Sequence, residues 1–235
     1  MVTTLCLVRH GETEGSEIPR YKGSIDVPLS LRGEEQVRQT SLRLAEYLSR
    51  LLGARQKSYL RDIHENKKEG GRGSEGTEKG ERVRLDAIYC SPLCRATKSA
   101  KLIAAPHGLE PVAIPDLRER HFGVWEGLTF SEIKEGWPQA FSDWAADPVN
   151  FAPPEGESTL EVARRGERVL AELLPRHRGQ SLALVAHGGI NRVLLCQLLG
   201  LPLANLFRLE QDLACFNIIE MWNDLPVLKL LNAAP

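Results

Sequence analysis

The sequence predicts a three-layer α/β/α sandwich with a mainly parallel central sheet. Short, continuous apolar runs at Thr4–Arg9, Leu85–Cys90 and Leu182–Ala186 have the length and composition of buried strands. Segments with apolar residues at helical spacing separate these runs. Strands that alternate with helices are typical of parallel sheets covered by helices.

The first helix is expected from Ser30 to about Leu52. Ser30 is a typical N-cap residue, Glu34 lies near the first turn, and apolar side chains recur at helical spacing from Val37 onward. Ser91–Ala105 predicts a second helix with Pro92 in its first turn. The later expected elements are a short strand at Pro111–Ile114, a helix at Ser158–Arg176, an apolar helix ending at Leu199, and strands at Cys215–Trp222 and Val227–Leu231.

A flexible insertion is expected from Gly53 to Arg84. This stretch has almost no large apolar residue after Ile63, and its centre, KKEGGRGSEGTEKG, mixes charges with glycine. Such a composition buries too little apolar surface to offset the entropy lost on ordering. We therefore expect a single domain over residues 1–235, interrupted at 53–84; a partner-binding or lid segment is the alternative for the insertion.

The composition excludes several classes of function. The 235 residues carry a net charge of −1, so no overall field attracts the chain to nucleic acid or to an anionic membrane. No apolar run reaches the length of a membrane span, and MVTTLCLVRH lacks the features of a signal peptide. Five irregularly spaced cysteines indicate free thiols in a reducing cytoplasm. We expect a cytoplasmic protein whose anion site is a local basic pocket.

Two predicted strands end at the same pair of residues. LCLVRHG ends at His10 and Gly11, and LALVAHG ends at His187 and Gly188. Ligands of open α/β sheets bind outside the carboxyl ends of the strands, so both histidines should point into one crevice. A lone histidine after a strand is more often a polar loop residue than a catalyst, and only the combination of motifs is informative.

Basic side chains lie at the first of these strand ends and after a third one. Arg9 precedes His10, and Arg95 lies one helical turn beyond the strand that ends in YCSPLCRAT. The SPL loop before Arg95 should direct backbone N–H groups at the start of a helix toward the crevice. Two guanidinium groups, two histidines and a helix N-terminus together predict a phosphate site.

These motifs resemble those of the histidine phosphatase superfamily, the phosphoglycerate-mutase-like enzymes. The matching segments are, in order, LVRHGET, RYKGSIDVPLSLRG, SPLCRAT, LRERHFGVWEGLT, PPEGES and LVAHGG. They extend over the whole chain except the insertion. The resemblance implies a phosphoglycerate-mutase-like fold and phosphoryl transfer through a phosphohistidine, with no cofactor and no metal.

The resemblance also implies a role for each matching residue. His10 is similar in position to the nucleophile, and Glu119 to the general acid and base. Arg9, Arg95 and His187 correspond to the groups that hold the phosphate. The chemistry agrees, because neutral imidazole is a competent nucleophile and two guanidinium groups can neutralise a transferring phosphoryl group.

Other side chains are weaker candidates. Thr13 and Ser16 lie in the first motif; the family often has asparagine at the position of Ser16, but serine can still donate a hydrogen bond to phosphate. Aromatic residues that could line a substrate pocket, although such positions are more often core, are Trp125, Trp137, Phe141 and Trp144.

His121 raises a metal alternative. Together with His10, Glu119 and His187 it would form a set suited to zinc or iron. The two arginines at the strand ends would repel a cation at close quarters, so we expect no metal site.

Three functions must still be distinguished: a phosphatase, a phosphoglycerate mutase and a non-catalytic binding domain. The segments VWEGLTFSEI and WPQAFSDWAADP look like those of the phosphatases in the family, and LFRLEQDLACFNIIEMWNDLPVLKLLN is similar to the ending of α-ribazole phosphatases. The long C-terminal tail of the mutases is not expected after the last strand. Lys134 is the only lysine or arginine between Arg120 and Arg164, so a second anionic group should find little complementary charge there.

The prediction is therefore a metal-independent phosphomonoesterase, with α-ribazole 5′-phosphate as one candidate substrate. A cofactor-dependent phosphoglycerate mutase is the alternative within the family. A non-catalytic phospho-ligand-binding domain is disfavoured because all five key side chains are present. The expected partner is a small-molecule phosphate ester and neither nucleic acid nor a membrane, and a homodimer is the oligomer considered.

Overall fold

The computed structural model describes residues 1–56, 60 and 84–235. The strands in these residues are β1 (Val2–Arg9), β2 (Ala87–Cys90), β3 (Val112–Ala113), β4 (Ser181–Ala186), β5 (Phe216–Trp222) and β6 (Leu225–Ala233). They form one sheet in the order β3-β2-β4-β1-β5-β6. Strands β1 to β4 run parallel, and β5 and β6 form an antiparallel hairpin beside β1. The expected mainly parallel sheet is confirmed.

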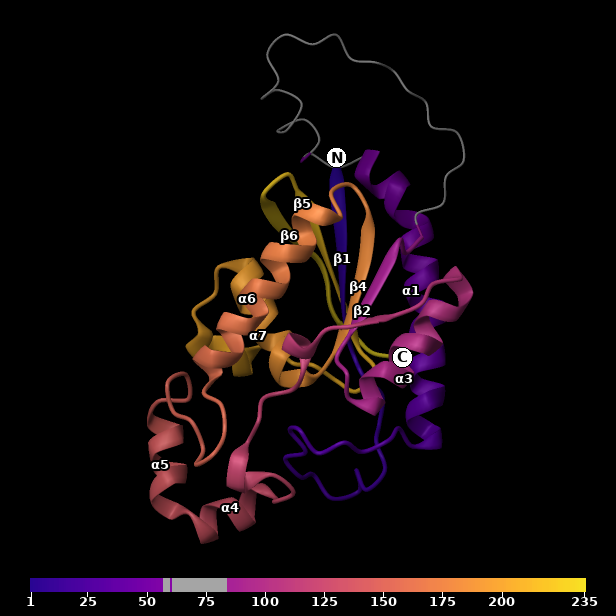
Figure 1. Ribbon diagram of the computed structural model, residues 1–235. Helices are drawn as coiled ribbons and strands as arrows, with labels where there is room; N and C mark the ends of the chain where they lie inside the picture. Colours follow the sequence, from indigo (N-terminus) through magenta and orange to yellow (C-terminus); the bar gives the residue numbers. More distant parts are fainter. Residues whose placement is uncertain (57–59, 61–83) are drawn as a thin grey trace.

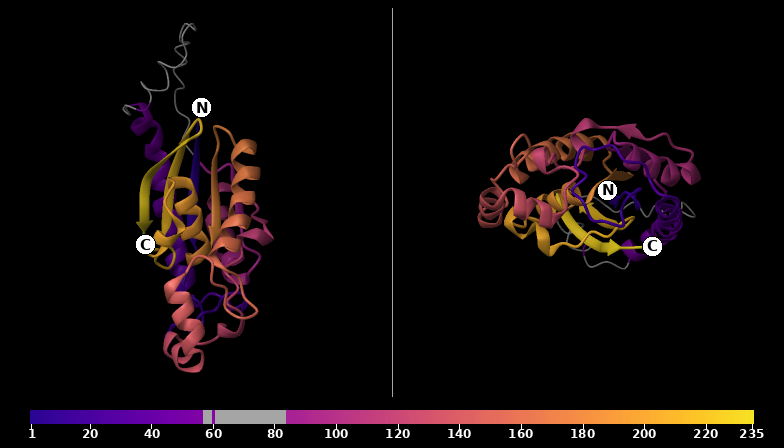
Figure 2. Two further views of the ribbon diagram at one scale, coloured as in Figure 1. Left: turned by 90° about the vertical axis from the view of Figure 1, so that its left-hand side faces the viewer. Right: turned by 90° about the horizontal axis from the view of Figure 1, so that it is seen from below.

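Helices cover both faces of this sheet (Figure 1; Figure 2). The α-helices are α1 (Leu31–Gln56), α3 (Cys94–Ala104), α4 (Phe130–Gly136), α5 (Pro138–Ala146), α6 (Thr159–Arg176) and α7 (Gly188–Leu199). The 3₁₀-helices are η1 (Ala105–His107), η2 (Pro115–Leu117), η3 (Gly123–Trp125) and η4 (Leu203–Arg208). Helices α1 and α3 lie on one face, and α6 and α7 on the other, which confirms the three-layer sandwich.

Alternate residues of β1 belong to two separate cores. Leu5 and Leu7 pack with residues of α6 and α7, whereas Cys6 and Val8 pack with residues of α1 and α3. A strand that is buried on both faces needs apolar side chains at successive positions, and this explains the continuous apolar run. The sheet is thus rigidly held, and its strand ends provide a stable base for the side chains that follow.

The first helix begins as expected and ends later. Ser30 caps it, because its Oγ accepts the Gly33 N–H at 3.0 Å. The helix continues to Gln56, beyond the expected end near Leu52, so the boundary expected at residue 53 is wrong. Arg55 supplies a physical reason, since its Nε donates to the buried carboxylate of Glu220 at 2.8 Å. The rest of the expected insertion falls mainly on residues 57–59 and 61–83, which lie outside the described residues.

The second helix starts three residues later than expected. Helix α3 begins at Cys94, so Pro92 precedes it and does not lie in its first turn. The Oδ1 of Asp26 accepts the Cys94 N–H at 2.7 Å and so caps the helix from a distant loop. Within the SPL loop, the Ser91 N–H donates to the carbonyl of Val185 at 3.0 Å and the Leu93 N–H to the Oγ of Ser91 at 3.3 Å, so the expectation that this loop directs free N–H groups at a phosphate is wrong.

Two helices were not expected at all. Helices α4 and α5 extend beyond the carboxyl end of the sheet, in a stretch whose aromatic and proline content masks any periodicity (Figure 1). The sequence does contain their start signals, since Thr129 and Glu132 form a capping box and Pro138 opens α5. Within residues 1–56, 60 and 84–235, no helix is both long and apolar enough to cross a membrane.

Candidate active site

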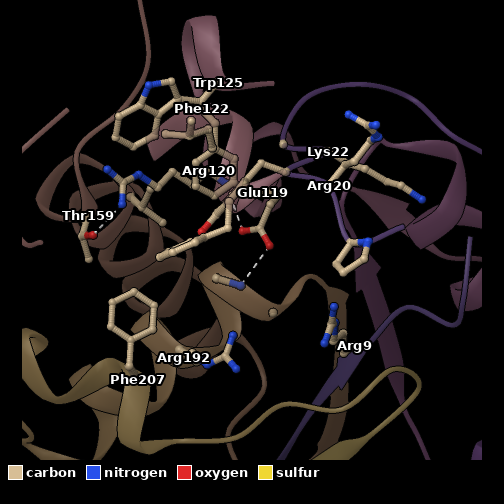
Figure 3. Close-up of a pocket in the computed structure, with 18 of the residues that line it drawn as sticks. Arg9, Arg20, Lys22, Glu119, Arg120, Phe122, Trp125, Thr159, Arg192 and Phe207 are labelled. Carbon is tan, nitrogen blue, oxygen red and sulfur yellow. Dashed lines mark hydrogen bonds between the residues drawn. The ribbon is translucent and has the colours of Figure 1, made fainter. Parts of the chain in front are cut away.

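A cavity of about 380 Å³ opens at the carboxyl end of the sheet. Arg9 and His10 enter it from the end of β1, Arg95 from α3, and Glu119 from the loop before η3. Figure 3 shows Arg9 and Glu119 among the lining side chains. Its volume suits a small molecule and is too small for a folded partner. The structure thus brings four of the residues expected at the site into one cavity wall.

His10 is held in one tautomer. Its Nδ1 lies 2.7 Å from the carbonyl oxygen of Gly11, and because a carbonyl only accepts, Nδ1 carries the proton. The Nε2 atom then keeps its lone pair. Burial, followed by the charges of Arg9 and Arg95, lowers the pKa of His10 well below its usual range, so the ring is neutral at neutral pH.

His187 lies behind His10 and not in the cavity wall. Its side chain is fully buried, its ring centroid is 5.0 Å from that of His10, and its Nε2 is 2.8 Å from the Oγ of Ser91. Burial, and then the neighbouring His10 and Arg95, lower the pKa of His187 well below its usual range. The two histidines are neighbours, but only His10 borders the open space.

The two expected arginines are anchored by backbone carbonyl groups. Arg95 donates from Nη1 to Ile25 and from Nη2 to Gly23, both at 2.7 Å, while Arg9 donates from Nη1 to the carbonyl of Gln211. The Nε of Arg9 is buried and has no hydrogen-bond partner among the described residues. Both guanidinium groups keep donors for an anion.

Glu119 lies across the start of α7. Its Oε1 accepts the N–H groups of Arg120 at 2.9 Å and Ile190 at 3.1 Å, and its Oε2 accepts that of Gly189 at 2.9 Å. Each carboxylate oxygen can accept two hydrogen bonds, so Oε2 keeps a free lone pair. A carboxylate with this freedom at a cavity wall can exchange a proton with a bound molecule.

Thr13 and Ser16 line the cavity together and share one cation. Their hydroxyl oxygens are 3.0 Å apart, and the ammonium group of Lys22 donates to both, as well as to the carbonyl of Glu14 at 2.8 Å. Lys22 was not among the expected residues. Nothing in its local spacing marks it, because a loop without periodicity carries it to the site.

Further cations line the cavity. Arg20 comes from the same loop as Lys22, Arg120 follows Glu119, and Arg192 comes from α7 (Figure 3). Arg192 lies four residues after Gly188, so helical spacing from the second His-Gly pair could have identified it. The expected scarcity of cations near residues 121–163 therefore does not extend to the cavity as a whole.

The metal alternative finds no support in the geometry. His121 does not line the cavity; its Nδ1 accepts the Gly123 N–H at 3.3 Å, and its Nε2 is 3.9 Å from Glu126. In the part of the chain that the structure describes, no group of three His, Cys, Asp or Glu side chains is arranged to hold a metal ion.

Three of the four aromatic residues expected as candidates to line a substrate pocket do line the cavity. Trp125, Phe141 and Trp144 line the cavity, whereas Trp137 does not. Additional apolar lining comes from residues not expected from the sequence, which include Phe122, Phe130, Leu206 and Phe207. The cavity thus combines cations near His10 with an extensive apolar wall.

The fold and the cavity define an α/β enzyme whose site suits a small anionic molecule. Residues 5–58 and 77–234 match the histidine phosphatase superfamily (branch 1), and the chain belongs to this family. It is a phosphatase, an enzyme that hydrolyses phosphomonoesters. The break in the match lies within the expected insertion.

Similar proteins carry more specific names. Phosphoserine phosphatase 1 of Hydrogenobacter thermophilus is 30% identical over 228 residues, which cover 97% of this chain and 91% of that protein. The adenosylcobalamin/α-ribazole phosphatase of Escherichia coli is 27% identical over 229 residues, covering 97% and 95%. The structure of the α-ribazole phosphatase from Shigella flexneri superposes with a TM-score of 0.75 at 26% identity, covering 98% of this chain and 96% of that one.

Proposed function

We propose that the chain hydrolyses a small-molecule phosphate monoester through a phosphohistidine formed on His10. The observation that carries the proposal is the fixed tautomer of His10, which presents a neutral Nε2 lone pair in a cavity shared with Arg9 and Arg95. Neutral imidazole is nucleophilic, and guanidinium groups stabilise the charge of a transferring phosphoryl group. His187 supports the arrangement by packing its ring against that of His10 in a T-shaped contact.

In the first step, Nε2 of His10 attacks phosphorus, and the bond between phosphorus and the ester oxygen breaks. Arg9, Arg95 and the cluster of Thr13, Ser16 and Lys22 hold the phosphoryl oxygens. The leaving oxygen takes a proton from protonated Glu119, so an alcohol departs and Glu119 becomes a carboxylate.

In the second step, water attacks phosphorus and the bond between phosphorus and Nε2 of His10 breaks. The carboxylate of Glu119 takes the proton from that water, and its free Oε2 lone pair supports this role. Inorganic phosphate leaves, and both side chains return to their starting states. No metal and no cofactor take part.

Among the substrates named for its relatives, α-ribazole 5′-phosphate fits the cavity better than phosphoserine. Glu119 is the only acid among the described residues that line the cavity, and it already accepts three backbone N–H groups. The ammonium group of phosphoserine would lack an acidic partner, and burying it unpaired is unfavourable. The apolar wall instead suits a ring.

We also infer a single histidine phosphatase domain interrupted after Gln56, in a cytoplasmic protein. All five cysteines are free, in agreement with a reducing compartment. A homodimer stays a prediction, which light scattering of the purified protein tests.

The deciding experiment is to trap the intermediate. The protein reacts briefly with substrate and is quenched without acid, and peptide mapping should locate phosphate on His10. His10→Ala should lose both the adduct and turnover, while the control His121→Ala should keep both, because His121 lies outside the cavity. Normal turnover by His10→Ala would end the proposal.

A further inference from the structure

Four aromatic side chains form a connected wall on one side of the cavity. Phe130 begins α4, Phe141 and Trp144 lie on α5, and Phe207 lies on η4. The ring centroids are 4.9 Å apart for Phe130 and Phe141, 5.6 Å for Phe141 and Trp144, and 6.0 Å for Trp144 and Phe207. Segments that are more than 60 positions apart in the chain thus meet through their rings.

Phe207 of this aromatic wall lies on the opposite side of Glu119 from one group of cations. In Figure 3, Arg9, Arg20 and Lys22 lie on one side of Glu119, and Phe207 and Trp125 lie on the other, where Arg120 also lies. A phosphate held beside His10 would therefore leave the rest of a substrate directed past Glu119 toward the rings. This is the direction in which the leaving group must extend if Glu119 is to protonate it.

The wall is more than packing between α5 and η4. Phe130 is 50% exposed and Phe207 is 56% exposed, although rings of this size are usually buried. The neighbouring Leu206 is only 5% exposed, and it packs η4 against the hydrophobic core together with Leu203. Exposed rings that surround a cavity are typical of ligand-binding surfaces.

We propose that Phe130, Phe141, Trp144 and Phe207 form a leaving-group subsite that selects monoesters carrying a flat, uncharged ring. The proposal rests on the proposed function, because it takes the phosphate to lie at His10. A ring can pack edge-to-face or offset against aromatic side chains, and such a contact is stronger than apolar burial alone. The subsite then discriminates by the ring of the alcohol and not by the phosphate.

A matched pair of substrates isolates this contribution. α-Ribazole 5′-phosphate and ribose 5-phosphate present the same primary phosphate ester, and only the first carries an aromatic base. We expect kcat/KM to be at least about tenfold higher for α-ribazole 5′-phosphate. Equal values for the two substrates in the wild-type protein would overturn the subsite.

Two variants locate the effect in the aromatic wall. Phe207→Ala and Trp144→Ala should each raise KM for α-ribazole 5′-phosphate about fivefold to tenfold and leave ribose 5-phosphate within about twofold. Phe207→Tyr should retain the wild-type KM. The control is Leu42→Ala, which truncates an apolar side chain on α1 that is 63% exposed and does not line the cavity. If both variants raised KM equally for α-ribazole 5′-phosphate and for ribose 5-phosphate, the proposal would be contradicted.

Binding separates this inference from the proposed chemistry. In the His10→Ala background, calorimetry should show tighter binding of α-ribazole 5′-phosphate than of ribose 5-phosphate, and Phe207→Ala should remove most of the difference. A preserved binding difference combined with normal turnover by His10→Ala would refute the phosphohistidine and support the subsite. Turnover that depends on His10, together with equal binding of the two compounds, would support the phosphohistidine and refute the subsite.

Discussion

The carboxylate of Glu119 lies directly against the backbone of Gly189, and only glycine permits this contact. The Oε2 of Glu119 accepts the Gly189 N–H at 2.9 Å, and a Cβ added at residue 189 would lie 2.5 Å from Oε1. That distance is shorter than real Cβ contacts, so a side chain at 189 would displace the carboxylate. The glycine thereby sets the position of the proposed acid and base.

Gly189→Ala should reduce kcat about 100-fold, within the range of general acid–base contributions. The variant should remain folded, because alanine is the better helix former at the start of α7. Steady-state kinetics and thermal unfolding measure the two effects. Gly136→Ala in α4 is the control, since nothing lies within 4 Å of a Cβ there. A fully active Gly189→Ala protein would show that the position of Glu119 is not critical.

The two buried histidines predict an acid-sensitive fold. Above pH 6.5 both rings are neutral in the folded and unfolded chains, and they add no pH dependence. Below pH 6.5, both histidines bind protons in the unfolded chain. In the folded chain they do not, because their pKa values are lowered. The free energy of unfolding should therefore fall by up to about 1.4 kcal/mol per pH unit for each histidine.

Urea unfolding measured between about pH 7 and about pH 5.5 tests this sign. His10→Asn removes one of the two titrating rings, so its stability should fall less steeply with acidification than that of the wild-type protein. Identical slopes for the two proteins would show that His10 does not resist protonation in the folded state.

Much of this site could be predicted from local sequence because its key residues follow buried strands. Continuous apolar runs identify β1 and β4, and the residues at their ends are carried to one edge of the sheet. The expected positions of His10, Arg9 and Arg95 follow from that rule. Glu119 has no strand before it and was expected only from the family resemblance.

The features of the fold and the site that were not predicted depend on contacts between segments far apart in the chain. Asp26 caps α3 from a loop 68 positions away, and Phe207 meets Trp144 in the wall of the cavity. Lys22 reaches Thr13 and Ser16 through an irregular loop. Neither periodicity nor capping signals encode such pairs, so they become visible only in the folded chain.

Metal removal supplies a further test. The proposed charge neutralisation comes from guanidinium groups, so prolonged treatment with EDTA followed by gel filtration should leave kcat unchanged. Added zinc or manganese should not raise it. Activity that disappears with the chelator and returns with either ion would instead favour a metal-assisted reaction.

The glycine-rich segment should be dispensable. Removal of Lys67–Gly80, which lies outside the described residues, should leave the melting temperature and kcat/KM nearly unchanged, because closure entropy varies slowly with loop length. The family match also breaks between residues 58 and 77. A glycine-serine segment of equal length is the control. A deletion that unfolds the protein, when the replacement does not, would show that the segment length is required.

The buried ion pair at the far end of β1 leads to the last prediction. Glu220 is fully buried, accepts from Nε of Arg55 at 2.8 Å and from Nε1 of Trp222 at 3.0 Å, and lies 3.9 Å from the ammonium group of Lys229. Arg55 also donates to the hydroxyl of Thr4. Arg55→Ala would leave the carboxylate without its closest cation, which costs about 3–5 kcal/mol in other buried pairs.

Arg50→Ala is the matched control for this prediction. Arg50 lies on the same helix and pairs with Glu46, but both side chains are largely exposed, so its loss should cost about 0.5 kcal/mol or less. Replacing Arg55 and Glu220 together by methionine should recover most of the stability lost by Arg55→Ala, because no buried charge then remains unpaired. Urea unfolding of the three variants decides the matter. Equal losses for Arg55→Ala and Arg50→Ala would show that the buried pair does not hold the end of α1 to the sheet.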